Sequence, residues 1–295
     1  MSSATLDNLV KAGTKLTPMM SQYYEIKKNY QEHIVLFRMG DFYEVFFEDA
    51  KELARILNIA LTHRGKLGDT PVPMAGIPHH AATNYIDRLT QAGERVAICE
   101  QVQDPKDAVG IVKRAVTQVV SPGLPFCLNQ AKRDDNYFIG AAIQSEEKFF
   151  LVMLDYSTGQ FVGWKLNSPE ELNDILTQFQ PKEFLCHPGQ WARSPEIEKR
   201  LIDLSILKNL ISSEFFEEDY KHHLLEKFIP NYQSDKIINN NISIIRPVNA
   251  LASFIHNTQG HTDFHHLTPL KIIEKSEHLQ VSASTLIGLE ILPKT

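Results

Sequence analysis

The start of the chain carries a helical pattern of apolar residues followed by an extended one. Thr17 is a residue type that caps helices, Pro18 suits the first helical position, and the mixed apolar spacing of 19–30 predicts a helix. The β-branched and aromatic run 33–39 ends at Gly40 and predicts a buried strand.

Helix and strand patterns continue to alternate up to residue 120. The apolar residues of 47–57 form one helical stripe, whereas 70–78 contains three prolines and Gly76, so we expect an extended loop there with little ladder pairing. A helix is predicted over 81–91, stopped by Gly93, and strands follow at 95–101 and 115–120. This order predicts a mixed α/β domain.

Residues 121–125, with two prolines and one glycine, interrupt both kinds of regular structure. Beyond this break the pattern changes to short strands, at 137–143, 149–156, 160–165 and 183–186. Ser168 and Pro169 predict the start of a helix over 172–179. Antiparallel strands followed by alternating helix and strand indicate a second α/β domain.

We therefore predict three segments: a first domain over 1–125, a second over 126–265, and a third over 266–295. The last residues, 272–295, are apolar in patches and have no capping residue at their end. We expect them to begin a helix that belongs to a further domain.

Composition indicates a globular protein, since 43% of the 295 residues are hydrophobic and 22% are charged. No apolar run approaches the roughly 20 residues of a membrane-spanning helix, and 1–10 lacks the pattern of a signal peptide. Cys99, Cys127 and Cys186 are widely spaced, which favours neither a disulfide framework nor a zinc site. We therefore expect the protein to reside in a reducing compartment, the cytoplasm.

The formal net charge of -6 argues against a nucleic-acid binder when taken alone. Residues 1–125 are nevertheless neutral, with 14 basic and 14 acidic side chains, so the excess negative charge lies in the second part. Individual basic residues of the first part remain candidates for contacts with nucleic acid. They are Arg38, Arg64, Lys66, Lys106, Lys113 and Arg114. For any single one of these, a solvated surface residue is the commoner outcome.

Motifs of the common catalytic sites are absent. There is no G-x-x-x-x-G-K-[ST] loop to cradle phosphates, no H-E-x-x-H and no G-x-S-x-G. His261, His265 and His266 have helical spacing beside Asp263, which fits a polar helix end better than a metal site. We therefore predict no catalytic residue, no cofactor-binding residue and no metal ligand.

The segment 37–44, Phe-Arg-Met-Gly-Asp-Phe-Tyr-Glu, is the most specific signal in the chain. Four further segments accompany it in fixed order, Thr-Pro-Met-Met at 17–20, Pro-Met-Ala-Gly-Ile-Pro-His-His at 73–80, Val-Ala-Ile-Cys-Glu-Gln-Val at 96–102 and Val-Ser-Pro-Gly at 120–123. Together they resemble the mismatch-binding domain of the bacterial MutS family. Asp135-Asn136 and 155–159 resemble its connector domain, which is RNase H-like without nuclease activity, and 281–290 resembles the first helix of its lever domain.

The resemblance implies roles for particular residues. Phe42 would wedge into the minor groove and Glu44 would contact the wedged base, while Arg64 and Met74 match parts of the family domain near the DNA. Lys113 and Arg114 are basic residues that could reach phosphates. Spacing alone would make Phe42 a core residue, Glu44 a solvated strand residue and Met74 a core gap-filler. The surrounding matches favour the DNA-binding roles for Phe42 and Glu44.

The resemblance also implies partners and a location. These are duplex DNA with mismatches or small loops and a MutL-type repair protein, in the bacterial cytoplasm near the nucleoid. In the family, ATP and Mg²⁺ belong to an ATPase domain, and the homodimer needs the full-length protein. Most of the lever, the clamp and the ATPase are not expected in this chain, so we expect no enzyme activity from it.

Two other functions stay open at this point. The chain could be an interaction module whose connector domain docks a MutL-type partner, with little DNA binding of its own. It could also be a nuclease of the RNase H type, which would need several carboxylates around Asp155, whereas the sequence offers only one there.

Overall fold

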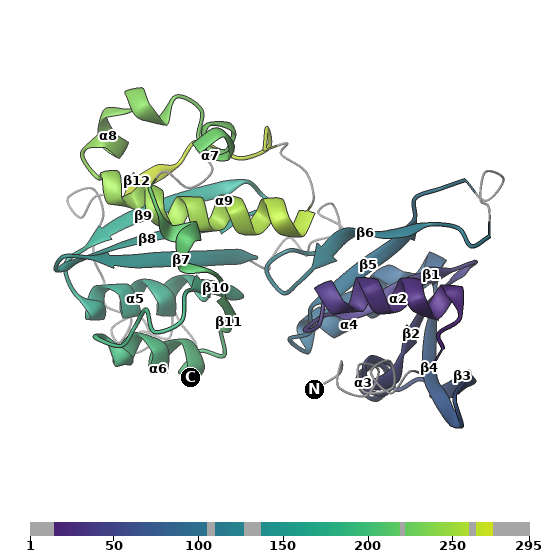
Figure 1. Cartoon of the computed structure of the whole chain (residues 1–295). Coiled ribbons are helices and arrows are strands. Elements are labelled where there is room, and N and C mark those ends of the chain that lie inside the picture. The colour runs from purple at the N-terminus through teal and green to yellow at the C-terminus, as the bar shows by residue number, and fades with distance from the viewer. Residues whose placement is uncertain (1–14, 105–109, 127–136, 219–221, 260–263, 274–295) are drawn as a thin grey trace. The chain divides into compact units, whose positions relative to one another are not determined.

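The computed structural model describes residues 15–104, 110–126, 137–218, 222–259 and 264–273. The chain divides into two compact units, Met1–Leu128 and Asn129–Thr295, called the first and second unit below (Figure 1). Both units combine a mixed sheet with helices, which confirms the predicted α/β class.

A six-stranded sheet with the order β3-β4-β2-β1-β5-β6 forms the first unit. Its strands are β1 (Ile34–Met39), β2 (Phe42–Phe46), β3 (Thr62–Leu67), β4 (Thr70–Pro78), β5 (Val96–Gln101) and β6 (Arg114–Val120). The pair β1 and β5 is parallel and the other pairs are antiparallel. The helices are α2 (Pro18–Asn29), α3 (Phe47–Leu57), α4 (Ala82–Gln91) and the 3-10 helix η1 (His79–Ala81).

Helix α2 begins where the sequence predicts it. The Thr17 Oγ1 accepts a hydrogen bond from the Met20 backbone N–H at 3.3 Å, and Pro18 takes the first helical position, where its missing N–H has no cost. Met20 and Tyr23 are the helix residues that enter the core on this side. The predicted helices at 47–57 and 81–91 are also confirmed, as α3 and α4.

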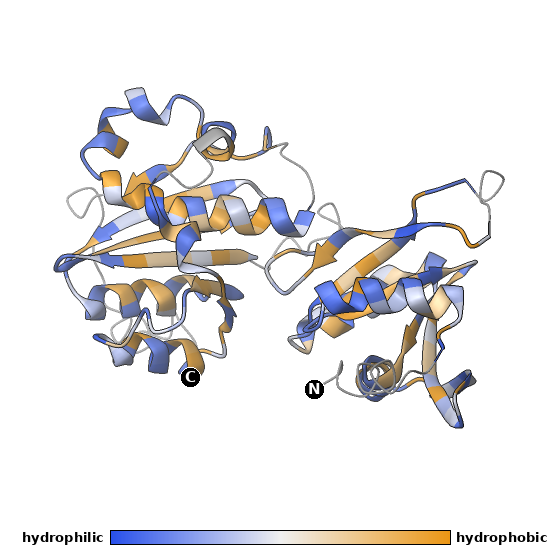
Figure 2. Ribbon diagram, in the orientation of Figure 1, coloured by the Kyte–Doolittle hydropathy of each residue, from blue (hydrophilic) through white to orange (hydrophobic). Residues whose placement is uncertain are grey.

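Alternation along β2 sorts its side chains onto two opposite faces of the sheet. Tyr43 and Val45 lie in a core that α3 and α4 cover, whereas Phe46 lies in the core beneath α2. Figure 2 shows the resulting distribution, with apolar strands inside and polar residues on the outer sides of the helices. Phe42 and Glu44 share the face of Phe46 but stand toward the hairpin end of the strand.

Strand β4 contradicts the expected loop at 70–78, because it pairs with both β2 and β3. Its prolines are tolerated because pairing with β2 covers only Met74–Pro78, so Pro71 and Pro73 have a single neighbouring strand, β3. A proline in such a half-paired stretch removes an N–H that no partner on the open side requires. The expected loop was wrong because proline count alone does not show which side of a strand is paired.

A second six-stranded sheet, with the order β11-β10-β7-β8-β9-β12, forms the second unit. Its strands are β7 (Phe138–Ser145), β8 (Lys148–Asp155), β9 (Gln160–Leu166), β10 (Glu183–Cys186), β11 (Leu207–Leu210) and β12 (Lys271–Ile273). Strands β7, β8 and β9 are antiparallel, and β10 and β11 continue the sheet in parallel with β7. This mixed sheet with helices confirms the α/β class that the family resemblance implied for the second domain.

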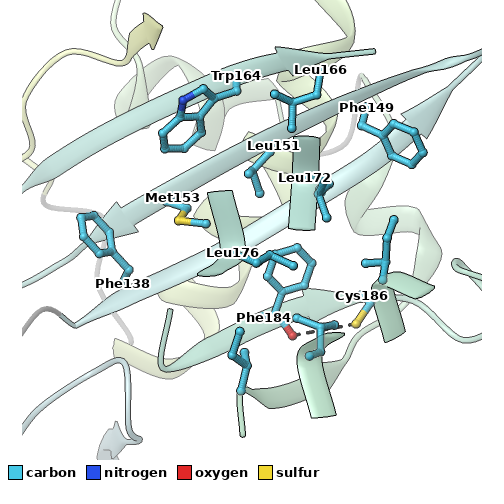
Figure 3. Close-up of a cluster of buried hydrophobic side chains, with 14 of the residues drawn as sticks. Phe138, Phe149, Leu151, Met153, Trp164, Leu166, Leu172, Leu176, Phe184 and Cys186 are labelled. Carbon is cyan, nitrogen blue, oxygen red and sulfur yellow. Dashed lines mark hydrogen bonds between the residues drawn. The ribbon is translucent and has the colours of Figure 1, made fainter. Parts of the chain in front are cut away.

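Helices cover both faces of this sheet. They are α5 (Pro169–Phe179), α6 (Pro195–Asp203), α7 (His222–Phe228), α8 (Lys236–Asn239) and α9 (Ile245–Gln259), with the 3-10 helices η4 (Ser213–Phe216), η5 (Tyr232–Ser234) and η6 (Ile242–Ile244). Figure 3 shows the core on the α5 side, where Leu172 and Leu176 of α5 face Leu151 and Met153 of β8. Helix α9 packs against β7 and β8.

The segment after α9 returns to the sheet of the second unit. Strand β12 pairs in parallel with β9, so residues 271–273, placed by the sequence in the third segment, are here part of the second sheet. The segment 281–290 lies outside the described residues, as does Cys127. In the described part of the chain, no helix is long and apolar enough to cross a membrane.

Candidate nucleic-acid interface

Phe42 stands at the tip of the hairpin that joins β1 and β2. It pairs with Met39 across a two-residue turn, in which Gly40 adopts a φ of +58° that favours glycine. The backbone N–H of His79 donates to the Asp41 carbonyl at 2.8 Å, which fixes the turn against β4. Phe42 is 49% exposed, so the alternative that it is a core residue is wrong.

Glu44 follows Phe42 on the same face, and its carboxylate is paired with Arg64. The Nη1 of Arg64 donates to both carboxylate oxygens, and the Glu44 side chain is only 14% exposed. Two residues that the sequence proposed as separate DNA contacts thus contact each other. The expectation from spacing alone, a solvated Glu44, is wrong.

Two glycines allow Arg64 to reach Glu44 across the intervening strand β4. The register of β3 shifts between His63 and Lys66, where Gly65 has a φ of +63°, and such a bulge changes the direction of the side chains beside it. Gly76 lies opposite Glu44 in the ladder, and a Cβ there would lie 3.9 Å from the Glu44 Cγ. The missing side chain leaves room above β4 for the ion pair.

Met74 lies on the same side of the sheet, opposite Phe46 in the ladder. It is partly buried and packs against the core beneath α2, while its carbonyl accepts a 3.0 Å hydrogen bond from the Thr62 hydroxyl. The structure therefore supports a packing role for Met74, with part of its surface still accessible.

Arg114 is held by the protein rather than extended into solvent. Its Nε donates to the Arg38 carbonyl at 2.6 Å, its Nη1 donates to the Val112 carbonyl at 2.9 Å, and its guanidinium stacks 5.0 Å from the centroid of the Phe37 ring. Burial lowers the pKa of the Arg114 guanidinium, against the opposing effect of the Glu44 carboxylate. Arg114 thus braces the end of β1 from which the Phe42 hairpin turns.

The remaining basic candidates differ in their surroundings. Lys113 and Lys66 are exposed, and Lys113 precedes β6 with its backbone bonded to Gln103 and Val102. Arg38 donates to the Gly40 carbonyl at 2.6 Å and stands over the Tyr43 ring. Lys106 lies outside the described residues.

The opposite face of the hairpin carries a second polar contact that the sequence did not predict. The Tyr43 hydroxyl donates to the Glu100 carboxylate, and burial together with this bond raises the pKa of Tyr43. Glu100 comes from the segment 96–102, so this contact joins two of the segments that carry the family resemblance, 37–44 and 96–102. The two segments are far apart in the sequence, and only the order of strands in the sheet shows that they meet. The contact could therefore not be predicted from either segment alone.

Asp155, the residue that raised the possibility of a nuclease, has a structural role at the end of β8. Its Oδ1 accepts from the backbone N–H of Ser157 and Thr158 at 2.9 and 3.2 Å, and from the Ser157 hydroxyl at 2.6 Å. Its Oδ2 accepts from the Tyr137 N–H at 3.3 Å. The carboxylate is buried and closes the turn between β8 and β9.

The other residues considered for a metal site or a reactive thiol do not form such a site in the described part of the chain. Among the residues that the structure describes, no three His, Cys, Asp or Glu side chains are grouped to hold a metal ion. His265 and His266 lie in a turn, so the predicted helix end is wrong for them, and His261 and Asp263 lie outside the description. Burial raises the pKa of the Cys99 and Cys186 thiols to about 12 and about 11, so both are unreactive thiols of the core.

Comparison with known proteins adds to this geometry. Residues 17–125 match the family profile of MutS domain I, and residues 137–269 match that of MutS domain II. The chain belongs to the MutS family. The first match contains the Phe42 hairpin and the ion pair between Glu44 and Arg64. The second match contains every strand of the second sheet except β12.

Curated relatives named DNA mismatch repair protein MutS share this region. The chain is 36% identical over 278 residues to the protein of Lactococcus lactis subsp. cremoris, and 37% identical over 283 residues to that of Streptococcus suis. The protein of Desulfatibacillum aliphaticivorans is 34% identical over 280 residues. These alignments cover 94 to 95% of the chain, and the chain spans 31% of the length of each relative.

Proposed function

We propose that the first unit binds mispaired or looped-out bases in double-stranded DNA, with Phe42 wedged into the minor groove and Glu44 against the wedged base. The observation that supports this most directly is the exposed Phe42 ring at a hairpin tip, with the Glu44 carboxylate beside it on the same face. The names of the MutS relatives, as mismatch repair proteins, agree with such a role.

The chemistry of the two side chains explains selectivity without base-specific contacts. A ring that enters the minor groove must unstack a base step, at a cost on the order of a few kcal/mol, and this cost is smallest where pairing is already faulty. The carboxylate repels the phosphates of intact duplex, whereas beside a displaced base it accepts a hydrogen bond. Weak pairs are thus detected by their deformability.

The wedge is tested by Phe42→Ala in a titration with matched and mismatched oligonucleotides of otherwise equal sequence. We expect mismatch affinity to fall to the matched value while matched affinity stays within about twofold, since phosphate contacts are unchanged. Leu61→Ala is the control, because Leu61 is a second exposed apolar residue of the first unit, 43% exposed. A mismatch preference that survives Phe42→Ala in a folded protein contradicts the proposal.

A second candidate function is docking of a MutL-type partner by the second unit. Two observations favour it: Leu210 of the edge strand β11 is 61% exposed, and Ile202 of the adjacent helix α6 is 70% exposed. Replacing both with Ser should weaken binding to a MutL-type protein and leave DNA binding unchanged. Equal partner binding by the double variant argues against this surface.

We further propose that this binding needs neither ATP nor a metal ion, which the family uses elsewhere. The sequence has no phosphate-cradling loop. Calorimetry of the chain with ATP and Mg²⁺ should give no saturable heat. Saturable binding would require a nucleotide site that neither sequence motifs nor the described residues suggest.

A further inference from the structure

We propose that Arg64 sets the selectivity of the interface by acting on Glu44, as a positioning residue, rather than by contacting the DNA backbone itself. This inference rests on the proposed function of the first unit. Its basis is the ion pair, in which the Arg64 Nη1 contacts both oxygens of the Glu44 carboxylate. The pair holds the carboxylate in place on the face that also presents Phe42.

The arrangement is specific to this position of the sheet. β3 is an edge strand separated from β2 by β4, so an ordinary side chain of β3 would not meet one of β2. The bulge at Gly65 redirects Arg64, and Gly76 leaves the surface above β4 open between the two partners. Two separate features of the chain, the bulge and Gly76, therefore serve the same contact.

Stability alone does not explain the pair. The Arg64 side chain is 40% exposed, and ion pairs that water reaches contribute little to folding. Glu44, in contrast, is 14% exposed, so it cannot turn freely toward solvent while the pair is intact. The pair fixes the direction of the carboxylate and offsets its charge.

Holding the carboxylate in place has a direct consequence for duplex binding. A carboxylate released by the loss of its guanidinium partner can turn toward the phosphates and repels them more strongly than one that is held away from them. Loss of Arg64 should therefore weaken binding of matched duplex chiefly through Glu44. If Arg64 were instead a phosphate contact, its loss would weaken binding to the same extent whether or not Glu44 carries a charge.

A double-mutant cycle on the full chain separates these two cases. Arg64→Gln should weaken matched-duplex binding by roughly fivefold or more at low salt, but by less than about twofold when Glu44→Gln is also present. Lys66→Gln is the matched control, since it removes the same charge from the same exposed strand. Its effect should be equal in both backgrounds.

An equal effect of Arg64→Gln in the two backgrounds overturns the proposal. If the single variant does not fold, as judged by circular dichroism, Glu44→Gln and Glu44→Gln/Arg64→Gln still decide the question, because neither leaves the poorly exposed Glu44 carboxylate without its partner. A loss of several fold between these two overturns the proposal, and a change within about twofold supports it. The cycle uses matched duplex, so it stays informative even if Phe42→Ala shows that mismatch recognition fails.

Discussion

Phe42 and Glu44 project from one face of β2, with the ring exposed at the hairpin tip and the carboxylate held by Arg64 one step further along the strand. The hairpin that presents them is braced on the same side by Arg114 and on the other by the contact of Tyr43 with Glu100. An exposed apolar ring on such a supported turn is suited to insertion into DNA. Because the turn is already ordered, binding costs little conformational entropy.

Glu44→Gln should raise the affinity for matched duplex by a few fold at low salt, because it removes the carboxylate that repels phosphates and keeps a hydrogen-bonding amide. Mismatch affinity should change less, so selectivity falls. Fluorescence anisotropy with both duplexes measures this. Glu48→Gln, a change of the same charge on α3, should leave both affinities within about twofold, and equal effects of the two variants would refute the assignment.

Lys27→Met should strongly destabilise the first unit. The Lys27 Nζ lies 2.7 Å from the Asp49 Oδ2 with both side chains nearly fully buried, and it also donates to the carbonyls of Gln31 and His33. Leaving Asp49 without this partner should cost about 3–5 kcal/mol of the free energy of unfolding. Urea denaturation gives the value, and Lys28→Met, on the exposed side of α2, is the control.

His33 should make the first unit lose stability in acid. Burial, with the nearby charges of Arg95 and Lys27, lowers the pKa of His33 to about 4 from its ordinary value of 6.5. The unfolded chain therefore binds one more proton than the folded chain between about pH 4 and pH 6.5, so stability falls as the pH drops through this window, by up to about 1.4 kcal/mol per pH unit.

Urea denaturation of the unaltered chain and of His33→Gln at several pH values checks this. The variant should show a shallower dependence of the free energy of unfolding on pH between about pH 4 and pH 6.5. Identical pH dependences of the two proteins would mean that His33 stays protonated in the fold, in disagreement with its burial.

Gly159→Ala should destabilise the second unit by more than the usual glycine replacement. Gly159 has a φ of +76°, and a Cβ there would collide with the backbone of His266 and lie 3.2 Å from the Leu267 Cα. Gly189 has a similar φ of +73° but open space around it, so Gly189→Ala measures the backbone strain alone, about 1–2 kcal/mol. Equal losses for the two variants would show that the segment after α9 moves aside at little cost.

Much of the fold was predictable from local patterns. The helices at 18–29 and 47–57 have a capping residue or a complete apolar stripe, and the strands β7, β8 and β9 are apolar runs between turn residues. Strand β4 was not predictable in this way, because its pairing depends on which neighbours reach each half of it. The apolar α9 was also not predicted, and it is buried along most of its length in the second unit.

The candidate site, like the fold, was predictable from the sequence only in part. The exposure of Phe42 agrees with the motif, whereas spacing alone favoured burial. The pairing of Glu44 with Arg64 had no local signal, because the two residues are 20 positions apart on strands that are not neighbours. Arg114 resembled a phosphate ligand by its charge, but its guanidinium is engaged by Arg38, Val112 and Gln22.

The central claim, that Phe42 unstacks a faulty base step, is tested most directly by a fluorescent base analogue such as 2-aminopurine placed beside a mismatch, since its emission rises on unstacking. At protein concentrations that saturate binding, checked by anisotropy, the unaltered chain and Leu61→Ala should raise the emission with mismatched duplex and leave it nearly unchanged with matched duplex. Phe42→Ala should bind at higher concentration without raising the emission. An equal rise with Phe42→Ala would show that unstacking does not depend on the ring and would contradict the account.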